Sequence, residues 1–183
     1  MSKFPGRSGS ALLVIDVQNG VVKNAWHRDE IIQNINSLLK KARGGNTSVI
    51  WVQHSEEEMP IDSDDWQIVP ELIPLESEPI VRKRFRSSFE ETDLDSILEN
   101  SQVDHLYISG AQTNNCVRHT THAALERGYD VTLVGDAHTT SDFDWELGPV
   151  QASVIIDEQN ASCLGYALPG RTCNLATTVE VNF

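Results

Sequence analysis

Basic side chains are scarce in this sequence, which has 14 lysines and arginines against 27 acidic residues and a formal net charge of −13. Nucleic acids and anionic membranes are themselves negatively charged, and no stretch of the chain gathers enough lysine and arginine to offset the repulsion. These two classes of partner are therefore excluded. A dissolved small molecule is the expected partner.

A long apolar run is also missing. The first apolar stretch, residues 11–15, is far shorter than the roughly 20 residues that span a bilayer, and it leads directly into Asp16. Residues 1–10 carry no long apolar segment after their charges. We therefore expect no signal peptide and predict a cytoplasmic protein.

Cysteine is rare as well. Cys116, Cys163 and Cys173 form no C-x-x-C pair, and their odd number leaves at least one thiol unpaired. A Cys163–Cys173 disulfide stays open as an alternative, but cytosolic proteins seldom carry one. The sequence thus disfavours that bond.

What the chain does contain is an alternation of short apolar runs with helical patterns. The apolar runs predict strands at about residues 10–17, 47–53, 79–83, 103–109, 129–134 and 176–181. Apolar residues at helical spacing predict helices at about residues 29–43, 66–72, 93–99, 114–127 and 148–157. Strands that alternate with helices indicate an α/β fold with a parallel sheet, and no internal boundary divides residues 1–183.

Three reactive side chains stand where predicted strands end. Asp16 ends the first strand, Lys83 ends the third, and Cys116 comes just after the strand at residues 103–109. Ligands of open parallel sheets bind beyond the carboxyl ends of the strands, so the three residues should meet at one edge. Taken singly, an acid can be a turn residue, a lysine a solvated one, and a cysteine a small packed side chain.

Together, the three residues provide the parts of an acyl-transfer site. If Thr113 caps the following helix, Cys116 occupies the first turn, where the helix dipole favours a thiolate. Lys83 would favour the anion further. Asp16 could accept the thiol proton and later deliver it to a leaving amine.

Several segments resemble the signature segments of isochorismatase-like cysteine hydrolases. They are residues 14–19 (VIDVQN), the strand-end Lys83, residues 110–117 (GAQTNNCV), residues 128–131 (GYDV) and residues 136–140 (DAHTT). They occur in the order and at the spacing of the family. Beyond residue 140 the resemblance fades.

The resemblance implies a three-layer α/β/α fold with a six-stranded, mainly parallel, Rossmann-like sheet. It also implies that Asp16, Lys83 and Cys116 form a catalytic triad that acts through a thioester. Members of the family often have a cis peptide bond, here between Ala111 and Gln112, and the backbone N–H groups of Gln112 and Cys116 would form the oxyanion hole. Relatives are commonly dimers or larger, so a homo-oligomer is expected.

The chain departs from some members of the family. Nicotinamidases carry an Asp-x-His metal pair after the second strand, where this chain has Gln53, His54, Ser55 and Glu56. His54 and Glu56 alone are too few for a metal site, so we predict no metal and no cofactor. True isochorismatases lack the nucleophilic cysteine, so Cys116 argues against hydrolysis of a vinyl ether.

A few further residues are candidates for the substrate pocket. Phe89 resembles a pocket-wall aromatic residue, Trp26 lies in a loop expected near the cleft, and Asn19, His54 and His138 are placed similarly. Packing in or over the core is an equal alternative for Phe89 and Trp26.

The function predicted from the sequence is cysteine-dependent hydrolysis of a C–N bond in a small amide, carbamoyl or ureido compound. Two alternatives stay open. One is a vinyl-ether hydrolase of the isochorismatase type, and the other is a catalytically silent binding protein with the same fold.

Overall fold

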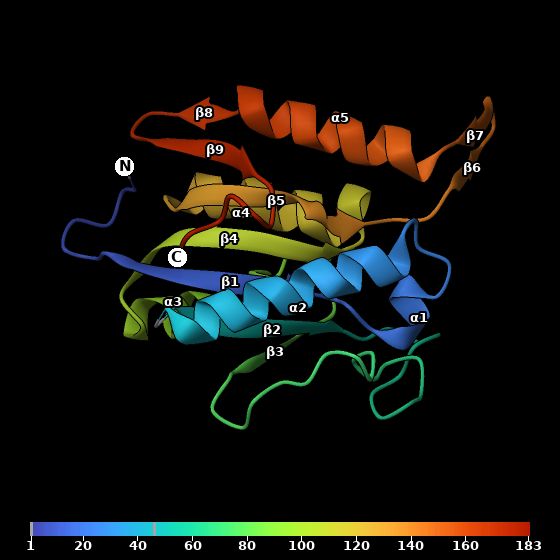
Figure 1. Cartoon of the computed structure of the whole chain (residues 1–183), viewed down its shortest axis with the longest axis horizontal. Coiled ribbons are helices and arrows are strands. Elements are labelled where there is room, and N and C mark those ends of the chain that lie inside the picture. The colour runs from blue at the N-terminus through green and yellow to red at the C-terminus, as the bar shows by residue number, and fades with distance from the viewer. Residues whose placement is uncertain (1, 46) are drawn as a thin grey trace.

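The computed structural model describes residues 2–45 and 47–183 and shows a central sheet between two layers of helices (Figure 1). The sheet has seven strands in the order β3-β2-β1-β4-β5-β9-β8. Neighbouring strands are parallel except for β8, which runs antiparallel to β9. The strands are β1 (Gly9–Ile15), β2 (Ser48–His54), β3 (Ile80–Lys83), β4 (Val103–Ala111), β5 (Asp130–Thr139), β8 (Ala167–Leu168) and β9 (Arg171–Ala176). The predicted α/β fold is confirmed, but the sheet has seven strands instead of the expected six, because β8 is added at one edge.

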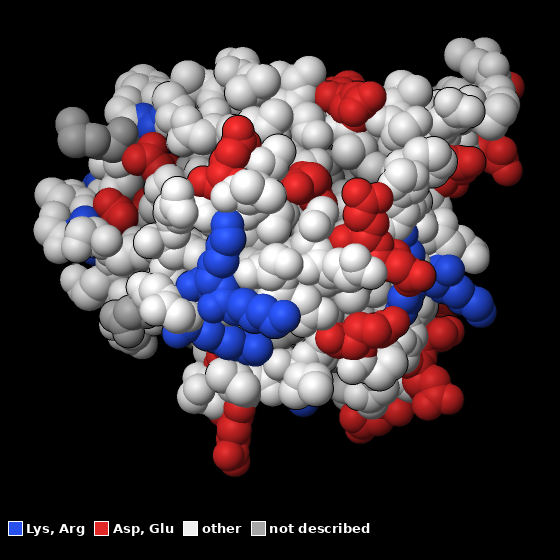
Figure 2. All heavy atoms as spheres, in the orientation of Figure 1, with Lys and Arg blue, Asp and Glu red and all other residues white. Residues whose placement is uncertain are grey.

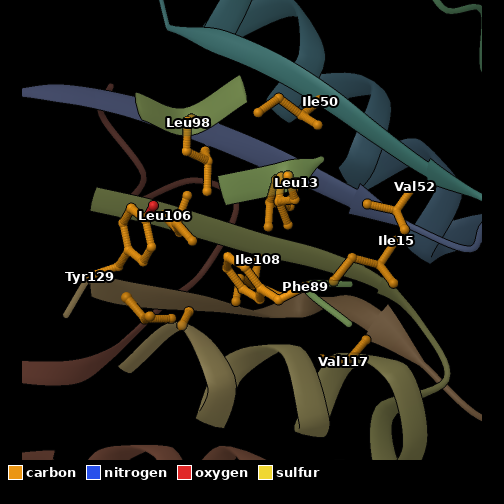
Figure 3. Packing of buried hydrophobic residues seen from close by; sticks show 14 of the residues in the cluster. Leu13, Ile15, Ile50, Val52, Phe89, Leu98, Leu106, Ile108, Val117 and Tyr129 are labelled. Carbon is orange, nitrogen blue, oxygen red and sulfur yellow. The ribbon is translucent and has the colours of Figure 1, made fainter. Parts of the chain in front are cut away.

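Helices cover both faces of this sheet. They are α1 (Asn19–Val22), α2 (Arg28–Gly44), α3 (Leu94–Asn100), the π-helical turn η1 (Thr113–Val117), α4 (Arg118–Arg127) and α5 (Ala152–Gly165). Leu13 and Ile15 of β1 pack in the cluster that holds residues of α3, α4 and α5 (Figure 3). Leu12 and Val14 pack against α2 on the other face. Burial on both faces explains why β1 reads as an unbroken apolar run.

The surface has the acidic character expected from the composition. Acidic side chains are spread over the face shown in Figure 2, and the basic ones gather in a few groups. Among the described residues, no helix is long and apolar enough to cross a membrane.

The predicted helix at residues 66–72 is wrong. This segment forms no helix and pairs with the chain that follows β1: Asn19 N–H donates to Gln67 O and Val69 N–H donates to Val17 O. Gln18 and Ile68 form an isolated antiparallel bridge. Val69 and Leu72 of this segment are buried in the core cluster that also contains residues of α2.

Two boundaries near the C-terminal end also differ. Residues 148–150 belong to a hairpin of β6 (Phe143–Trp145) with β7 (Gly148–Val150), so the predicted helix begins only at Ala152. The last strand is β9, which pairs with β5 and ends where the predicted strand at residues 176–181 was to start. Both differences come from strand pairing, which local periodicity does not reveal.

Cys163 and Cys173 form a disulfide, against the expectation from the sequence. Cys163 lies near the end of α5 and Cys173 lies in β9, and the turn through β8 brings their Cα atoms to 5.3 Å. Both side chains are buried in the core cluster. The bond therefore ties the last helix to the last parallel strand.

Gly110 permits the close approach of β4 to β1. Its φ angle is +115°, and a Cβ atom placed on it would lie 2.0 Å from the backbone oxygen of Ile15. Gly110→Ala should lower the free energy of unfolding by about 4 kcal/mol or more, because two central strands would have to separate. Urea denaturation of both proteins measures this loss.

Gly148→Ala is the matched control. Gly148 also has a positive φ, +124°, but nothing lies within 4 Å of its added Cβ. Only the backbone penalty applies there, about 1–2 kcal/mol. Equal losses for the two variants would contradict the importance of the contact between β4 and β1.

Candidate active site

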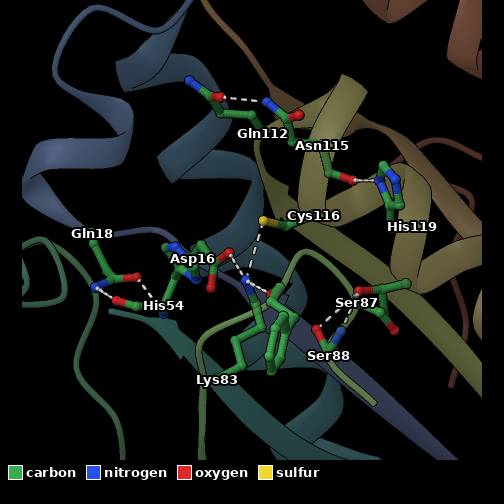
Figure 4. Close-up of polar contacts among 12 residues, drawn as sticks. Asp16, Gln18, His54, Lys83, Ser87, Ser88, Gln112, Asn115, Cys116 and His119 are labelled. Carbon is green, nitrogen blue, oxygen red and sulfur yellow. Dashed lines mark hydrogen bonds and ion pairs between the residues drawn. The ribbon is translucent and has the colours of Figure 1, made fainter. Parts of the chain in front are cut away.

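Asp16, Lys83 and Cys116 lie together beyond the carboxyl ends of the central strands (Figure 4). Asp16 directly follows β1, Lys83 is the last residue of β3, and Cys116 lies in η1, which follows β4. The order β3-β2-β1-β4-β5 reverses between β1 and β4, and such a reversal opens the crevice in which ligands bind. The predicted meeting of the three residues is confirmed.

Lys83 links the other two side chains. Its Nζ atom lies 2.6 Å from Asp16 Oδ2 and 3.1 Å from Cys116 Sγ, and it donates to Phe85 O at 3.2 Å. Lys83 and Asp16 are each 1% exposed, and the Cys116 thiol is free. A buried ammonium of this kind requires such partners, so the three groups form one electrostatic unit.

Burial sets the protonation state of the nucleophile. The pKa of the Cys116 thiol is raised to about 12, because burial and the Asp16 carboxylate both raise it and together outweigh Lys83, which lowers it. For Lys83, burial lowers the pKa, but the attraction of Asp16 and Cys116 outweighs it and the net shift is upward. The resting site therefore holds a thiol beside an ammonium. This shift opposes the thiolate that the helix start was expected to favour, because desolvation outweighs the favourable charge of Lys83.

The turn that carries Cys116 begins at a cis peptide bond between Ala111 and Gln112, as the resemblance implied. Gln112 is extended and is the residue before η1. Asn115 Nδ2 donates to Gln112 Oε1 at 3.0 Å, and Asn115 O contacts His119 Nδ1 at 2.8 Å. These bonds stabilise the turn around the thiol.

Thr113 does not cap the helix as the sequence suggested, because its hydroxyl is used elsewhere. Thr113 Oγ1 lies 2.9 Å from His138 Nδ1, and His138 Nε2 lies 2.9 Å from Asn160 Oδ1. His138 is completely buried, and this burial lowers its pKa to about 4. A neutral His138 thus donates to Asn160 and accepts from Thr113, which ties η1 to α5.

A cavity of about 620 Å³ opens above the thiol. Asp16 and Cys116 reach its surface, whereas the side chain of Lys83 is fully buried beneath them. The remaining walls come from the connections that follow β1, β2, β3 and β4. They are formed by Gly20, Val21, His54, Glu56, Glu58, Met59, Asp65, Arg84, Phe85, Arg86, Gln112 and Asn115.

A family model described as the isochorismatase domain matches residues 10–147. The chain belongs to the isochorismatase family. Among solved structures, it is similar to an isochorismatase from Pseudomonas putida (28% identity, TM-score 0.86, 94% of this chain and 89% of that one). It is also similar to a cysteine hydrolase from Pseudomonas syringae pv. phaseolicola (25% identity, TM-score 0.82, 93% and 89%).

Curated relatives in the isochorismatase family include a streptothricin hydrolase from Streptomyces noursei, 32% identical over 143 residues. This match covers 74% of the present chain and 56% of the relative, so the chain spans about half the length of that protein. The ureidoacrylate amidohydrolase RutB of Klebsiella pneumoniae is 27% identical over 153 residues, which are 61% of this chain and 65% of the relative. The family to which the chain belongs thus includes named hydrolases among its curated members.

Of the four residues predicted to bind substrate in this isochorismatase-family cavity, only His54 lines it. Phe89 is 4% exposed and packs in the core beside Tyr129, because the preceding Ser88 is bonded to Thr120 of α4. The core alternative therefore holds for Phe89.

Trp26 and Asn19 also lie outside the cavity lining. Trp26 stacks on His27 and borders a separate depression next to Ser141. Asn19 Nδ2 donates to Asp64 O, which fastens the start of α1 to the long connection after β2. His138, the further candidate, lies behind the nucleophile turn.

Sequence reasoning missed the role of Gln18. This side chain is fully buried, and its amide accepts from His54 N–H at 2.8 Å and donates to His54 O at 3.0 Å and to Trp66 O at 2.7 Å. It joins the ends of β1 and β2 to the connection that covers the cavity. The only signal was a polar side chain inside the VIDVQN segment.

Proposed function

We propose that this isochorismatase-family hydrolase cleaves a C–N bond of a small amide, carbamoyl or ureido compound, with Cys116 as the nucleophile. The observation that carries the proposal is the contact of one buried ammonium, that of Lys83, with both the Asp16 carboxylate and the Cys116 thiol at the floor of the cavity. A nucleophile, a proton acceptor and a counter-charge are the components that acyl transfer needs.

In the first half of the proposed reaction, Cys116 Sγ attacks the substrate carbonyl carbon while its proton passes to Asp16. Because burial raises the pKa of the thiol, proton transfer to Asp16 accompanies the attack in this proposal, and Lys83 stabilises the developing thiolate. The C–S bond forms and the carbonyl electron pair moves to oxygen. The backbone N–H groups of Gln112 and Cys116 are the proposed donors to this oxyanion.

In the second half, the C–N bond breaks and Asp16 returns the proton to the leaving nitrogen. An amine or ammonia departs, and the acyl group stays on Cys116 as a thioester. Asp16 then removes a proton from water as its oxygen attacks the thioester carbonyl. The acid is released and the proton restores the Cys116 thiol.

The alternatives have less support. A vinyl-ether hydrolase needs no thiol, yet a free cysteine lies on the cavity surface in contact with Lys83. A silent binding protein would have no use for a buried Asp–Lys pair beside that cysteine. The relatives named streptothricin hydrolase and ureidoacrylate amidohydrolase add support for C–N bond cleavage.

The direct test is a screen of primary amides, carbamoyl acids and ureido acids for release of ammonia. We expect turnover of at least one of these compounds, together with its inhibition by iodoacetamide as Cys116 becomes alkylated. Turnover that survives complete alkylation of Cys116 would refute the cysteine mechanism.

Activity should survive exhaustive dialysis against a chelator. His54 Nε2 and Glu56 Oε2 are 3.5 Å apart, and within residues 2–45 and 47–183 no group of three histidine, cysteine or acidic residues is placed to hold a metal ion. Turnover before and after dialysis, with and without added zinc, measures the effect. A loss that zinc restores would contradict the prediction and give His54 and Glu56 a metal-binding role.

A further inference from the structure

We propose that Arg84 and Arg86 form an anion subsite in the cavity that binds a carboxylate of the substrate. The inference deepens the proposed function, because it makes the preferred substrate an acidic amide, carbamoyl acid or ureido acid instead of a neutral amide. Both arginines line the cavity that holds the Cys116 thiol.

Among the described residues, Arg84 and Arg86 differ from the other arginines of the protein in that their side chains are unpaired. In the described part of the chain, neither side chain has a hydrogen-bond or ion-pair partner, although the protein has 27 acidic residues against 14 basic ones. Each of the other arginines has a partner. The Arg82 guanidinium lies over the Trp66 ring, and Arg171 donates to backbone carbonyls. The remaining five form ion pairs with carboxylates: Arg7, Arg28, Arg43, Arg118 and Arg127. Two unpaired guanidinium groups beside one reactive thiol are therefore available to a ligand.

The backbone between the arginines is fixed next to the nucleophile. Phe85 O accepts a hydrogen bond from Lys83 Nζ at 3.2 Å, and the same Nζ atom donates to Cys116 Sγ. Arg84 and Arg86 flank Phe85 in the sequence, so both side chains start from a segment anchored to the catalytic ammonium. A ligand group held by them would lie near the reacting carbonyl.

The acidic residues of the cavity lie on a different wall from the arginines, and this separation would orient an anionic ligand. Glu56, Glu58 and Asp65 line the cavity from the connection that follows β2, whereas the arginines come from the segment that follows β3. An anionic group is repelled from the first wall and attracted to the second. Guanidinium also matches a carboxylate with two parallel hydrogen bonds, which lysine does not provide.

Alkylation of Cys116 by a matched pair of reagents tests the subsite without any substrate. Iodoacetate is an anion and iodoacetamide is its neutral analogue, so the ratio of their rates reports the potential at the thiol. We expect this ratio in the wild-type protein to exceed the ratio for free cysteine in solution. Arg84→Gln and Arg86→Gln should each lower it by roughly fivefold, the effect of losing one nearby charge.

Arg82→Gln is the control, because it removes the same charge from the same segment but from a side chain that packs over Trp66 outside this cavity. It should leave the ratio close to that of the wild type. A wild-type ratio at or below that of free cysteine, or equal ratios in all three variants, would overturn the subsite.

A second arm uses turnover of two primary amides of equal length, glutaramate and the neutral valeramide. Arg84→Gln and Arg86→Gln should raise KM for glutaramate several-fold more than KM for valeramide. If wild-type protein hydrolyses neither amide nor any compound of the screen, the proposed function fails while the alkylation ratio still decides the subsite. Equal changes in KM for the two amides would overturn the anion subsite even if both are hydrolysed.

Discussion

Cys116→Ala should abolish turnover, with kcat lower by about 10⁴-fold or more, while the protein stays folded. The substitution removes the only group proposed to form the covalent intermediate. Cys116 reaches the surface of the cavity, so a smaller side chain there opens little space in the packed core. Ammonia release measures the loss, and a thermal melt followed by circular dichroism checks the fold.

Cys116→Ser is the matched variant, because it keeps the size and replaces sulfur by oxygen. It should also be strongly impaired, since a serine hydroxyl needs a stronger base than a carboxylate to act as a nucleophile. Turnover near the wild-type rate in either variant would exclude thiol catalysis. A silent binding protein would show no turnover in the wild type either, and both substitutions would leave it unchanged.

Asp16→Asn should block turnover and at the same time make Cys116 easier to alkylate. Asp16 is the proposed proton carrier, so without it the leaving nitrogen receives no proton and high pH should not rescue the reaction. Yet the Asp16 carboxylate raises the pKa of Cys116. Its removal should lower that pKa and speed the reaction with iodoacetamide at neutral pH. Normal turnover of this variant would give the proton-carrier role to another group.

Lys83→Met should move the same pKa in the opposite direction. The Lys83 charge lowers the pKa of Cys116, so its loss raises the pKa and slows alkylation at neutral pH. Raising the pH should recover much of the rate. Iodoacetamide rates against pH for the wild type and both variants measure the two shifts, with circular dichroism to confirm folding. An unchanged profile in Lys83→Met would show that Lys83 is not the counter-charge of the thiolate.

The outline of the fold and the meeting of the three central residues were predictable because both depend on local signals. A continuous apolar run such as β1 indicates a strand buried on both faces, and parallel strands bring the residues that follow them to one edge. Asp16, Lys83 and Cys116 could thus be placed together from their positions after predicted strands. The resemblance then supplied the cis peptide bond, which the structure confirms.

The predictions that were wrong concern residues whose contacts are made with parts of the chain that are distant in sequence. Residues 66–72 have an apolar pattern that fits a helix, but their backbone pairs with Val17 and Asn19. Cys163 and Cys173 come together only through the turn at β8. Phe89 is directed into the core by the bonds between Ser88 and Thr120.

The sequence by itself determined most of the central strands and the helices between them, which reactive side chains follow those strands, and therefore which reactive groups share the sheet edge. Only the tertiary structure decided the state of those groups. The pKa of Cys116 depends first on burial and then on Asp16 and Lys83, which are remote in the chain and act through space. The unpaired state of Arg84 and Arg86 likewise depends on where every carboxylate of the folded chain lies. Desolvation and Coulomb energy are sums over three-dimensional neighbours, so no local pattern contains them.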